Sequence, residues 1–235
     1  MTDSSLATYI SVDVWSDIAC PWCYIGKRRM EKALEEFTHS AGAPKVKITY
    51  HSYELSPDTP VDFDGTEVDF LVAHKGMPKE QVAQMLEQVT QVAAAEGLEY
   101  NFDSLQHTNT MRAHELLHFA KAHGKQAELK ERLLRAYFTE GRHVGDLNTL
   151  AELAADVGLD RTEALAALTT RRHSADVQAD IAQSHGFGVN GVPFYVIDGK
   201  YGLSGAQEPH VFVSALTQAA TDRDAPAAAE TPPDA

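Results

Sequence analysis

The chain has only two cysteines among its 235 residues, Cys20 and Cys23, and Pro21 and Trp22 lie between them. The segment PWCYIGKRRMEKALEEF predicts a helix that begins here, because proline is well tolerated at a first helical position. The free N–H groups and positive dipole end of a helix start favour a thiolate. We therefore expect Cys20 to exchange with a substrate disulfide or thiol, and Cys23, one turn further and more buried, to resolve the mixed disulfide.

A CxxC pair has three interpretations. A structural zinc site needs roughly four ligands, and the sequence contains no second CxxC to supply the other two. Two inert core cysteines would have no reason to lie at the junction between a strand and a helix. A redox-active pair explains both the spacing and the position, and we favour it. Pro21 and Trp22 are then candidates for substrate binding, with Trp22 on the rim of the active site.

A second pattern, NGVPFYVIDG, places Pro193 at the start of a β-rich run. Proline has no N–H to donate to a sheet, so a proline here either lies at a sheet edge or follows a cis peptide bond. The residues themselves leave both alternatives open.

The segment HELLH matches the zinc-protease pattern. In such an enzyme His114 and His118 lie on one face of a helix and bind zinc, while Glu115 is the general base. The same residues also fit an ordinary helix, NTMRAHELLHFA, that Asn109 or Thr110 can cap. We favour the ordinary helix and expect no metal site.

The elements that must position these residues follow from periodicity. Residues 9–15 alternate apolar with small or polar side chains, as a half-buried strand does. The helix that begins at Pro21 comes next, and residues 45–55 predict a second strand. The CxxC pair therefore stands at the start of the helix in a strand–helix–strand unit.

The rest of the chain comprises a helical tract, then a β-hairpin with a terminal helix, and then a tail. Residues 62–186 have the spacing and caps of five or six helices and contain no credible strand. FYVI and KYGL then predict a hairpin around the Asp198-Gly199 turn, followed by a helix over residues 206–220. Residues 221–235 have almost no large apolar side chain and predict a disordered tail.

Together these motifs resemble the DsbA-like branch of the thioredoxin superfamily, and within it the FrnE-like subgroup. The resemblance depends most on DVWSDIACPWCYIGKRRM and GFGVNGVPFYVIDGKYGLSGAQ, with support from YHSYELSPD and TNTMRAHELLHFA. It implies an α/β fold, a thioredoxin fold interrupted by an all-helical insertion between the second and third strands. The expected divisions are residues 7–61 and 187–220 for the two parts of the thioredoxin fold, 62–186 for the insertion and 221–235 for the tail.

The resemblance implies a thiol–disulfide oxidoreductase that needs no metal or organic cofactor and acts on protein or small-molecule thiols and disulfides. It also implies that the Val192–Pro193 bond is cis and stands opposite Cys20, where the Val192 backbone orients the substrate. Two accessory residues have alternatives open. Asp17 is either a surface acid or a proton acceptor for the second cysteine, and Asn109 either caps a helix or faces the CxxC cleft.

The 2-hydroxychromene-2-carboxylate isomerases and kappa-class glutathione transferases are related to this branch. Such proteins generally have a serine where this chain has Cys20, and the serine hydrogen-bonds the sulfur of glutathione. The alternative function is therefore a glutathione-dependent isomerase or transferase, including the polyketide isomerase type. The cysteine at position 20 favours exchange, with glutathione as a candidate co-substrate.

The composition argues against other classes. The 34 acidic residues outnumber 20 Lys and Arg, giving a formal net charge of −14, so we expect no nucleic-acid partner. The N-terminus lacks the basic and apolar regions of a secretory signal, and no apolar run reaches the roughly 20 residues that span a bilayer. We expect a cytoplasmic monomer or homodimer without membrane association. In the cytoplasm a CxxC pair is more often catalytic or metal-binding than a structural disulfide.

Overall fold

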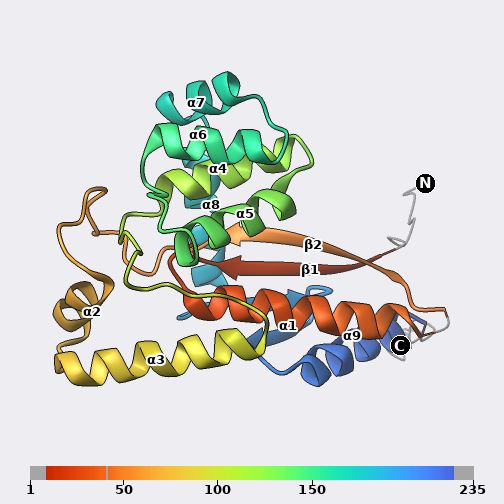
Figure 1. The fold of residues 1–235 in the computed structure, drawn as a ribbon. Helices are drawn as coiled ribbons and strands as arrows, with labels where there is room; N and C mark the ends of the chain where they lie inside the picture. Colours follow the sequence, from red (N-terminus) through yellow and green to blue (C-terminus); the bar gives the residue numbers. More distant parts are fainter. Residues whose placement is uncertain (1–8, 41, 225–235) are drawn as a thin grey trace, which may run out of the picture.

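The computed structural model describes residues 9–40 and 42–224, so most of the predicted tail lies outside the described residues. A four-stranded sheet in the order β2-β1-β3-β4 forms its centre (Figure 1). The strands are β1 (Tyr9–Ser16), β2 (Lys45–Ser52), β3 (Phe194–Ile197) and β4 (Tyr201–Ser204). β1 and β2 are parallel, whereas β3 is antiparallel to both β1 and β4.

The sheet core forms because β1 and α1 (Pro21–Thr38) each bury one apolar face. Ile10, Val12 and Val14 alternate along β1 and point to the same side. Met30 and Phe37 lie seven residues apart on α1 and join that cluster, as the helical repeat allows. The α9 helix (Pro209–Asp224) packs beside α1 and completes this layer (Figure 1).

Between β2 and β3 the chain forms seven helices and no strand, which agrees with the predicted all-helical insertion, although the sequence predicted five or six helices. A short break at residues 170–173, with Arg171 at a φ of 54°, separates the last two. The seven are α2 (Glu67–Lys75), α3 (Lys79–Ala95), α4 (Met111–Ala122), α5 (Gln126–Phe138), α6 (Leu147–Asp156), α7 (Arg161–Thr169) and α8 (Ser174–Gly186).

The insertion covers the second face and the open edge of the sheet. α8 packs against β2, and its Asp180 carbonyl accepts a hydrogen bond from the indole N–H of Trp15, which points away from α1. The Gln126 side chain at the start of α5 bonds both the N–H and the C=O of Tyr50 on β2. α2 lies beyond the ends at which β1 and β2 finish, and α3 runs back from there alongside α1 (Figure 1).

The C-terminal helix was predicted over residues 206–220, but it begins later, at Pro209, and ends later, at Asp224. Residues 221–224, expected as part of the tail, form the last turn of α9. Side-chain contacts hold this turn to the β3–β4 hairpin, because Tyr201 donates a hydrogen bond to Asp222 and Arg223 forms an ion pair with Asp198. Within the described residues, no helix combines the length and apolar character that crossing a membrane requires.

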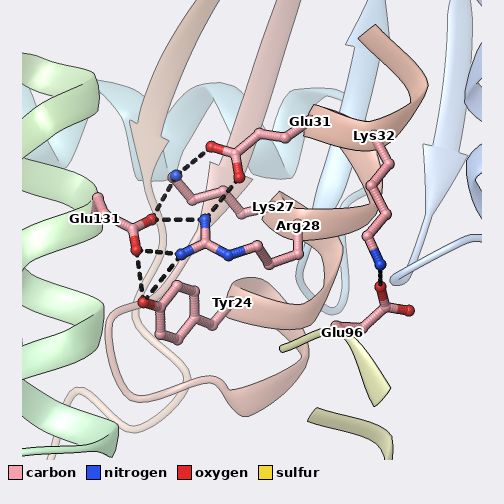
Figure 2. Close-up of polar contacts among 7 residues, drawn as sticks. All are labelled: Tyr24, Lys27, Arg28, Glu31, Lys32, Glu96 and Glu131. Atoms are coloured by element: carbon pink, nitrogen blue, oxygen red, sulfur yellow. Dashed lines mark hydrogen bonds and ion pairs between the residues drawn. The ribbon is translucent and has the colours of Figure 1, made fainter. Parts of the chain in front are cut away.

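α1 joins the sheet core to the insertion core. Tyr24, on a different face of α1 from Met30, packs into the cluster formed mainly by residues of the insertion. Its hydroxyl also enters a polar network in which Glu131 of α5 binds Lys27 and Arg28 of α1 (Figure 2). The start of α1 therefore lies where the two parts of the protein meet.

Candidate active site

The two cysteines begin α1 as predicted. Cys20 is the N-cap residue, and the Cys23 N–H donates to the Cys20 carbonyl at 3.0 Å. Both are free thiols and each is 3% exposed, so the expected difference in burial is wrong. They differ instead in what they face. Cys20 lines a cavity of about 500 Å³, whereas Cys23 lines one of only about 10 Å³. Only Cys20 adjoins a space large enough for a substrate.

The protonation of Cys23 is set by its surroundings. Burial raises the pKa of Cys23 well above its usual value, and the hydrogen bond with Cys20 raises it further. The charge of Lys130 on α5 lowers the pKa of Cys23. The Lys130 side chain is buried, and no described residue lies within hydrogen-bond distance of its Nζ. Burial lowers the pKa of Lys130 to about 8, which makes it a strong acid for a lysine.

The loop before β3 meets the CxxC pair. The Val192–Pro193 peptide bond is cis, and the Cys20 thiol donates a hydrogen bond to the Val192 carbonyl with an S···O distance of 3.4 Å. Gly26 permits the close approach of α1 to this loop. A Cβ at position 26 would lie 2.5 Å from the Tyr195 hydroxyl oxygen and 3.0 Å from Pro193 Cγ.

The structure brings most of the proposed substrate-binding residues together. Pro21, Trp22 and Val192 line the same cavity as Cys20, and Trp22 is 44% exposed at its rim. Pro193 does not line the cavity and instead contacts the α1 side of the loop through Gly26.

Asp17 is buried, so the surface-acid alternative is wrong. One of its carboxylate oxygens accepts from the Thr110 hydroxyl and from His114 Nε2, and the other accepts from the Leu55 N–H. Burial raises the pKa of Asp17, but the hydrogen bond and charge of His114, together with hydrogen bonds from Leu55 and Thr110, outweigh burial and lower the pKa. The backbone of Asp17 lowers the pKa of Cys23, whereas its carboxylate is not among the causes that shift that pKa. The carboxylate therefore fixes the loop that leads to α1.

The zinc-protease pattern does not form a ligand set. His114 Nε2 contacts Asp17, whereas His118 Nε2 lies 3.0 Å from Asp180. Glu115 forms an ion pair with Arg171 on the chain segment between α7 and α8. Within residues 9–40 and 42–224, no three His, Cys, Asp or Glu side chains are placed to hold a metal ion together.

The N-cap residue of α4 is Thr110, which makes no side-chain cap hydrogen bond, and Asn109 supports the start of the helix from one position earlier. Its side-chain oxygen accepts from the Met111 N–H at 2.9 Å, and its amide donates to the Pro57 carbonyl at 2.9 Å. The neighbouring Thr108 and Thr110 line the cavity beside Cys20, but Asn109 does not.

Sequence reasoning missed a buried pair in the cavity wall. His107 Nδ1 lies 2.7 Å from a carboxylate oxygen of Glu67, and both residues are buried and line the cavity. Because the two residues are 40 positions apart and belong to no motif, nothing in the sequence indicated that they would meet.

Comparisons with known proteins concern the family and the fold of the chain. The family model described as DSBA-like thioredoxin domain matches residues 11–217. The uncharacterized protein YwbO of Bacillus subtilis is 30% identical over 212 residues, which are 88% of this chain and 96% of that protein. The crystal structure of a probable DsbA oxidoreductase from Streptomyces coelicolor is 40% identical, with a TM-score of 0.85 over 93% of each chain.

Two more distant solved structures share the fold. A 2-hydroxychromene-2-carboxylate isomerase is 16% identical, with a TM-score of 0.67 over 91% of this chain and 98% of its own. The cytosolic disulfide reductase DsbM from Pseudomonas aeruginosa, solved with GSH, is 20% identical, with a TM-score of 0.59 over 90% of this chain and 99% of its own. At these identities the likeness concerns the fold alone.

Proposed function

The chain belongs to the family of DSBA-like thioredoxin domains, and we propose that it is a thiol–disulfide oxidoreductase in which Cys20 attacks and Cys23 resolves. One observation carries this assignment. Of two equally buried thiols, only Cys20 lines a cavity of substrate size, and it does so at the N-cap of α1. Resolution is an internal step and needs no such space around Cys23.

Reduction of a substrate disulfide requires two exchanges. The Cys20 thiolate forms a bond to one substrate sulfur, and the other substrate sulfur leaves as a thiolate that takes up a proton. Cys23 then loses its proton, forms the Cys20–Cys23 disulfide and releases the second substrate thiol. Oxidation of a substrate dithiol is the same sequence in reverse. The Val192 carbonyl, which accepts from the Cys20 thiol, becomes available to an N–H donor of a bound substrate once that thiol has reacted.

The test uses insulin disulfides with dithiothreitol as the final reductant. We expect Cys20→Ser to abolish the catalysed rate, because it removes the attacking sulfur. When the reduced Cys23→Ser variant meets insulin without dithiothreitol, it should instead accumulate a mixed disulfide on Cys20, and adding dithiothreitol should release it. A rate that Cys20→Ser leaves undiminished would refute the proposal.

The subgroup, the cellular location, the oligomeric state and the use of cofactors are also proposals. We propose that the chain is of the FrnE-like subgroup, acts in the cytoplasm as a monomer or homodimer, and uses no metal or organic cofactor. Glutathione is proposed as a thiol co-substrate, with support from the fold shared with the cytosolic reductase solved with GSH. Equilibration of the Cys20–Cys23 pair with reduced and oxidised glutathione tests this co-substrate and gives the direction of net exchange.

The fold shared with 2-hydroxychromene-2-carboxylate isomerase and the apolar cavity favour one second candidate, a glutathione-dependent isomerase. Turnover of a hydroxychromene carboxylate with glutathione distinguishes the two. In an isomerase this turnover survives Cys23→Ser, because isomerisation requires no resolving thiol.

A further inference from the structure

The loop that carries Val192 is anchored at both of its ends to one side chain of β1, Trp15. Phe187, the residue after α8, meets the indole ring edge-on with 5.3 Å between ring centroids. Phe194, the first residue of β3, pairs with Trp15 across the sheet. We call residues 188–193, which lie between these two anchors, the Val192 loop. Trp15 therefore supports the loop whose carbonyl faces the reactive thiol.

Trp15 is itself held by His51 of β2 and by α8. The imidazole ring of His51 stacks on the indole ring, with 4.5 Å between ring centroids and 16° between ring planes. The indole N–H donates to the Asp180 carbonyl of α8 at 3.0 Å, and the carboxylate of the same Asp180 lies 2.8 Å from His51 Nδ1. The imidazole, the indole and the start of the Val192 loop thus form one continuous set of contacts.

Both ring nitrogens of His51 face carboxylates. Nδ1 lies 2.8 Å from Asp180, and Nε2 lies 2.8 Å from Asp13 of β1. An ionised carboxylate only accepts hydrogen bonds, so two of them require a proton on each nitrogen, and the ring is then an imidazolium. The second Asp180 oxygen accepts from the Ser52 N–H at 2.8 Å and lies 3.0 Å from Nε2 of His118 on α4.

The charge of His51 depends on these carboxylates. Burial lowers the pKa of His51, but the hydrogen bonds and charges of Asp13 and Asp180 outweigh burial and raise the pKa above an ordinary 6.5. Burial raises the pKa of Asp180, but hydrogen bonds from its two histidine neighbours and from the Ser52 N–H outweigh burial and hold that pKa far below its usual value. The stabilisation from the charged ring is therefore complete below pH 6.5 and lost as pH rises through the raised pKa.

We propose that charged His51 is a positioning residue of the exchange site, which holds Trp15 and through it the Val192 loop until the imidazole loses its proton. The role rests on the proposed thiol–disulfide exchange, because the loop orients a substrate opposite Cys20. His51 does not line the cavity beside Cys20 and acts only through its neighbours. Once the proton is lost, one carboxylate has no donor from the ring, and the indole loses the cation stacked on it. The Val192 carbonyl is then in place for a substrate N–H for less of the time.

Tryptophan fluorescence tests the charge, because a protonated imidazole in contact with an indole quenches its emission. The chain has two tryptophans, so the reduced full-length protein with Trp22→Phe reports on Trp15 alone. We expect the emission to rise in one step with a midpoint above pH 6.5. His51→Gln should remove the step. Asp13→Asn, which keeps the ring but removes one carboxylate, should move it to lower pH, and His123→Gln, at the end of α4, should leave it unchanged.

Hydrogen exchange followed by mass spectrometry tests whether the charge holds the loop. At pH 6, peptides that cover residues 187–192 should exchange about tenfold faster in His51→Gln than in the parent, while peptides from α9 exchange alike. Above the pH of the fluorescence step, the two proteins should exchange alike throughout. Asp13→Asn is the second variant, and its loop should match the parent below its own lower step and exchange faster than the parent between the two steps.

A single turnover with a short peptide disulfide connects the loop to exchange. At pH 6 the reduced His51→Gln protein should react about tenfold more slowly than the parent, because the loop no longer orients the peptide. Above the fluorescence step the ratio of the two rates should approach one. Taking the ratio at each pH cancels the titration of the attacking thiol, which both proteins share.

Three results would overturn the inference while leaving the exchange reaction intact. They are a fluorescence step that survives His51→Gln, loop exchange that is equal in the two proteins at pH 6, and a rate ratio that does not change with pH. The last would mean that His51 acts as packing, since packing does not follow the charge of the ring. If Cys20→Ser reduces the peptide disulfide at the parent's rate, it is the proposed oxidoreductase function that fails.

Discussion

The thiol of Cys20 donates a hydrogen bond to the carbonyl oxygen of Val192, 172 residues away in the chain. Antiparallel pairing of β1 with β3 brings them together, because Trp15 near the end of β1 lies opposite Phe194 at the start of β3. The residues that follow β1 and those that precede β3 therefore meet at one edge of the sheet. The insertion between the strands leaves this pairing intact and adds a wall to the site.

The close approach of α1 to the Val192 loop predicts that Gly26→Ala is harmful. The added methyl group would lie 2.5 Å from the Tyr195 hydroxyl oxygen, so helix and loop must separate. We expect the free energy of unfolding to fall by about 1–3 kcal/mol and disulfide exchange to slow. Denaturant unfolding and the insulin assay measure the two effects.

A double variant identifies the contact responsible. Tyr195→Phe removes the hydroxyl, which has no hydrogen-bond partner among the described residues, so Gly26→Ala with Tyr195→Phe should recover part of the loss. Gly186→Ala, where an added Cβ meets nothing within 4 Å, is the control. The account of this contact is wrong if the double variant is no more stable than Gly26→Ala alone.

Local sequence patterns predicted the parts of the site that depend on local structure. Proline after Cys20 predicted the helix start, and the resemblance predicted the cis bond before Pro193, which the structure contains. The spacing of apolar residues and the helix-capping residues predicted an all-helical tract between the second and third strands. These features need only neighbouring residues or a shared motif to be recognised.

The remaining features arise from contacts between distant segments. Equal burial of the two cysteines could not be predicted from local patterns, because the Cys20 thiol contacts Val192, which is distant in the sequence. Lys130 lies in an ordinary helical pattern, and only packing of α5 against α1 places its charge near Cys23. The burial of Asp17 likewise depends on partners at Leu55, Thr110 and His114.

Lys130→Met should stabilise the protein in a pH-dependent manner. The pKa of Lys130 is lowered to about 8 in the fold from an ordinary 10.5, so between these values the unfolded chain binds the extra proton and stability rises with pH. Below pH 8 the fold carries the full cost of the buried charge, which methionine removes. The advantage of the variant should therefore be largest there and shrink by up to about 3 kcal/mol as pH rises toward 10.5.

Urea unfolding of both proteins between pH 6 and pH 10 measures this difference. Comparing the two at each pH largely cancels the titration of groups they share. Lys121→Met, on the exposed side of α4, should show no such trend. A constant difference between the parent and Lys130→Met across the range would contradict a lowered pKa at Lys130.

Glu131→Gln should weaken the junction between α1 and α5 (Figure 2). Burial raises the pKa of Glu131, but hydrogen bonds from Arg28, Lys27 and Tyr24 outweigh burial and lower the pKa to about 2. The stabilisation is therefore present above an ordinary pKa of 4.5 and lost as pH falls toward 2. Because the side chain is partly solvated, we expect a loss of only about 1 kcal/mol at neutral pH.

Acid unfolding followed by circular dichroism tests this sign. The difference between the parent and Glu131→Gln should vanish as pH approaches 2, while Glu87→Gln on exposed α3 should match the parent throughout. If the difference instead grows in acid, the network does not act through the ionised carboxylate.

Limiting alkylation tests most directly whether Cys20 is the attacking thiol and Cys23 the resolving one. The reduced protein is treated at neutral pH with less than one equivalent of iodoacetamide, and tandem mass spectrometry locates the label. We predict that Cys20 carries most of it, because only Cys20 faces the large cavity and the pKa of Cys23 is raised. In urea the preference should disappear. Equal labelling in the folded protein, or preferential labelling of Cys23, would contradict the account.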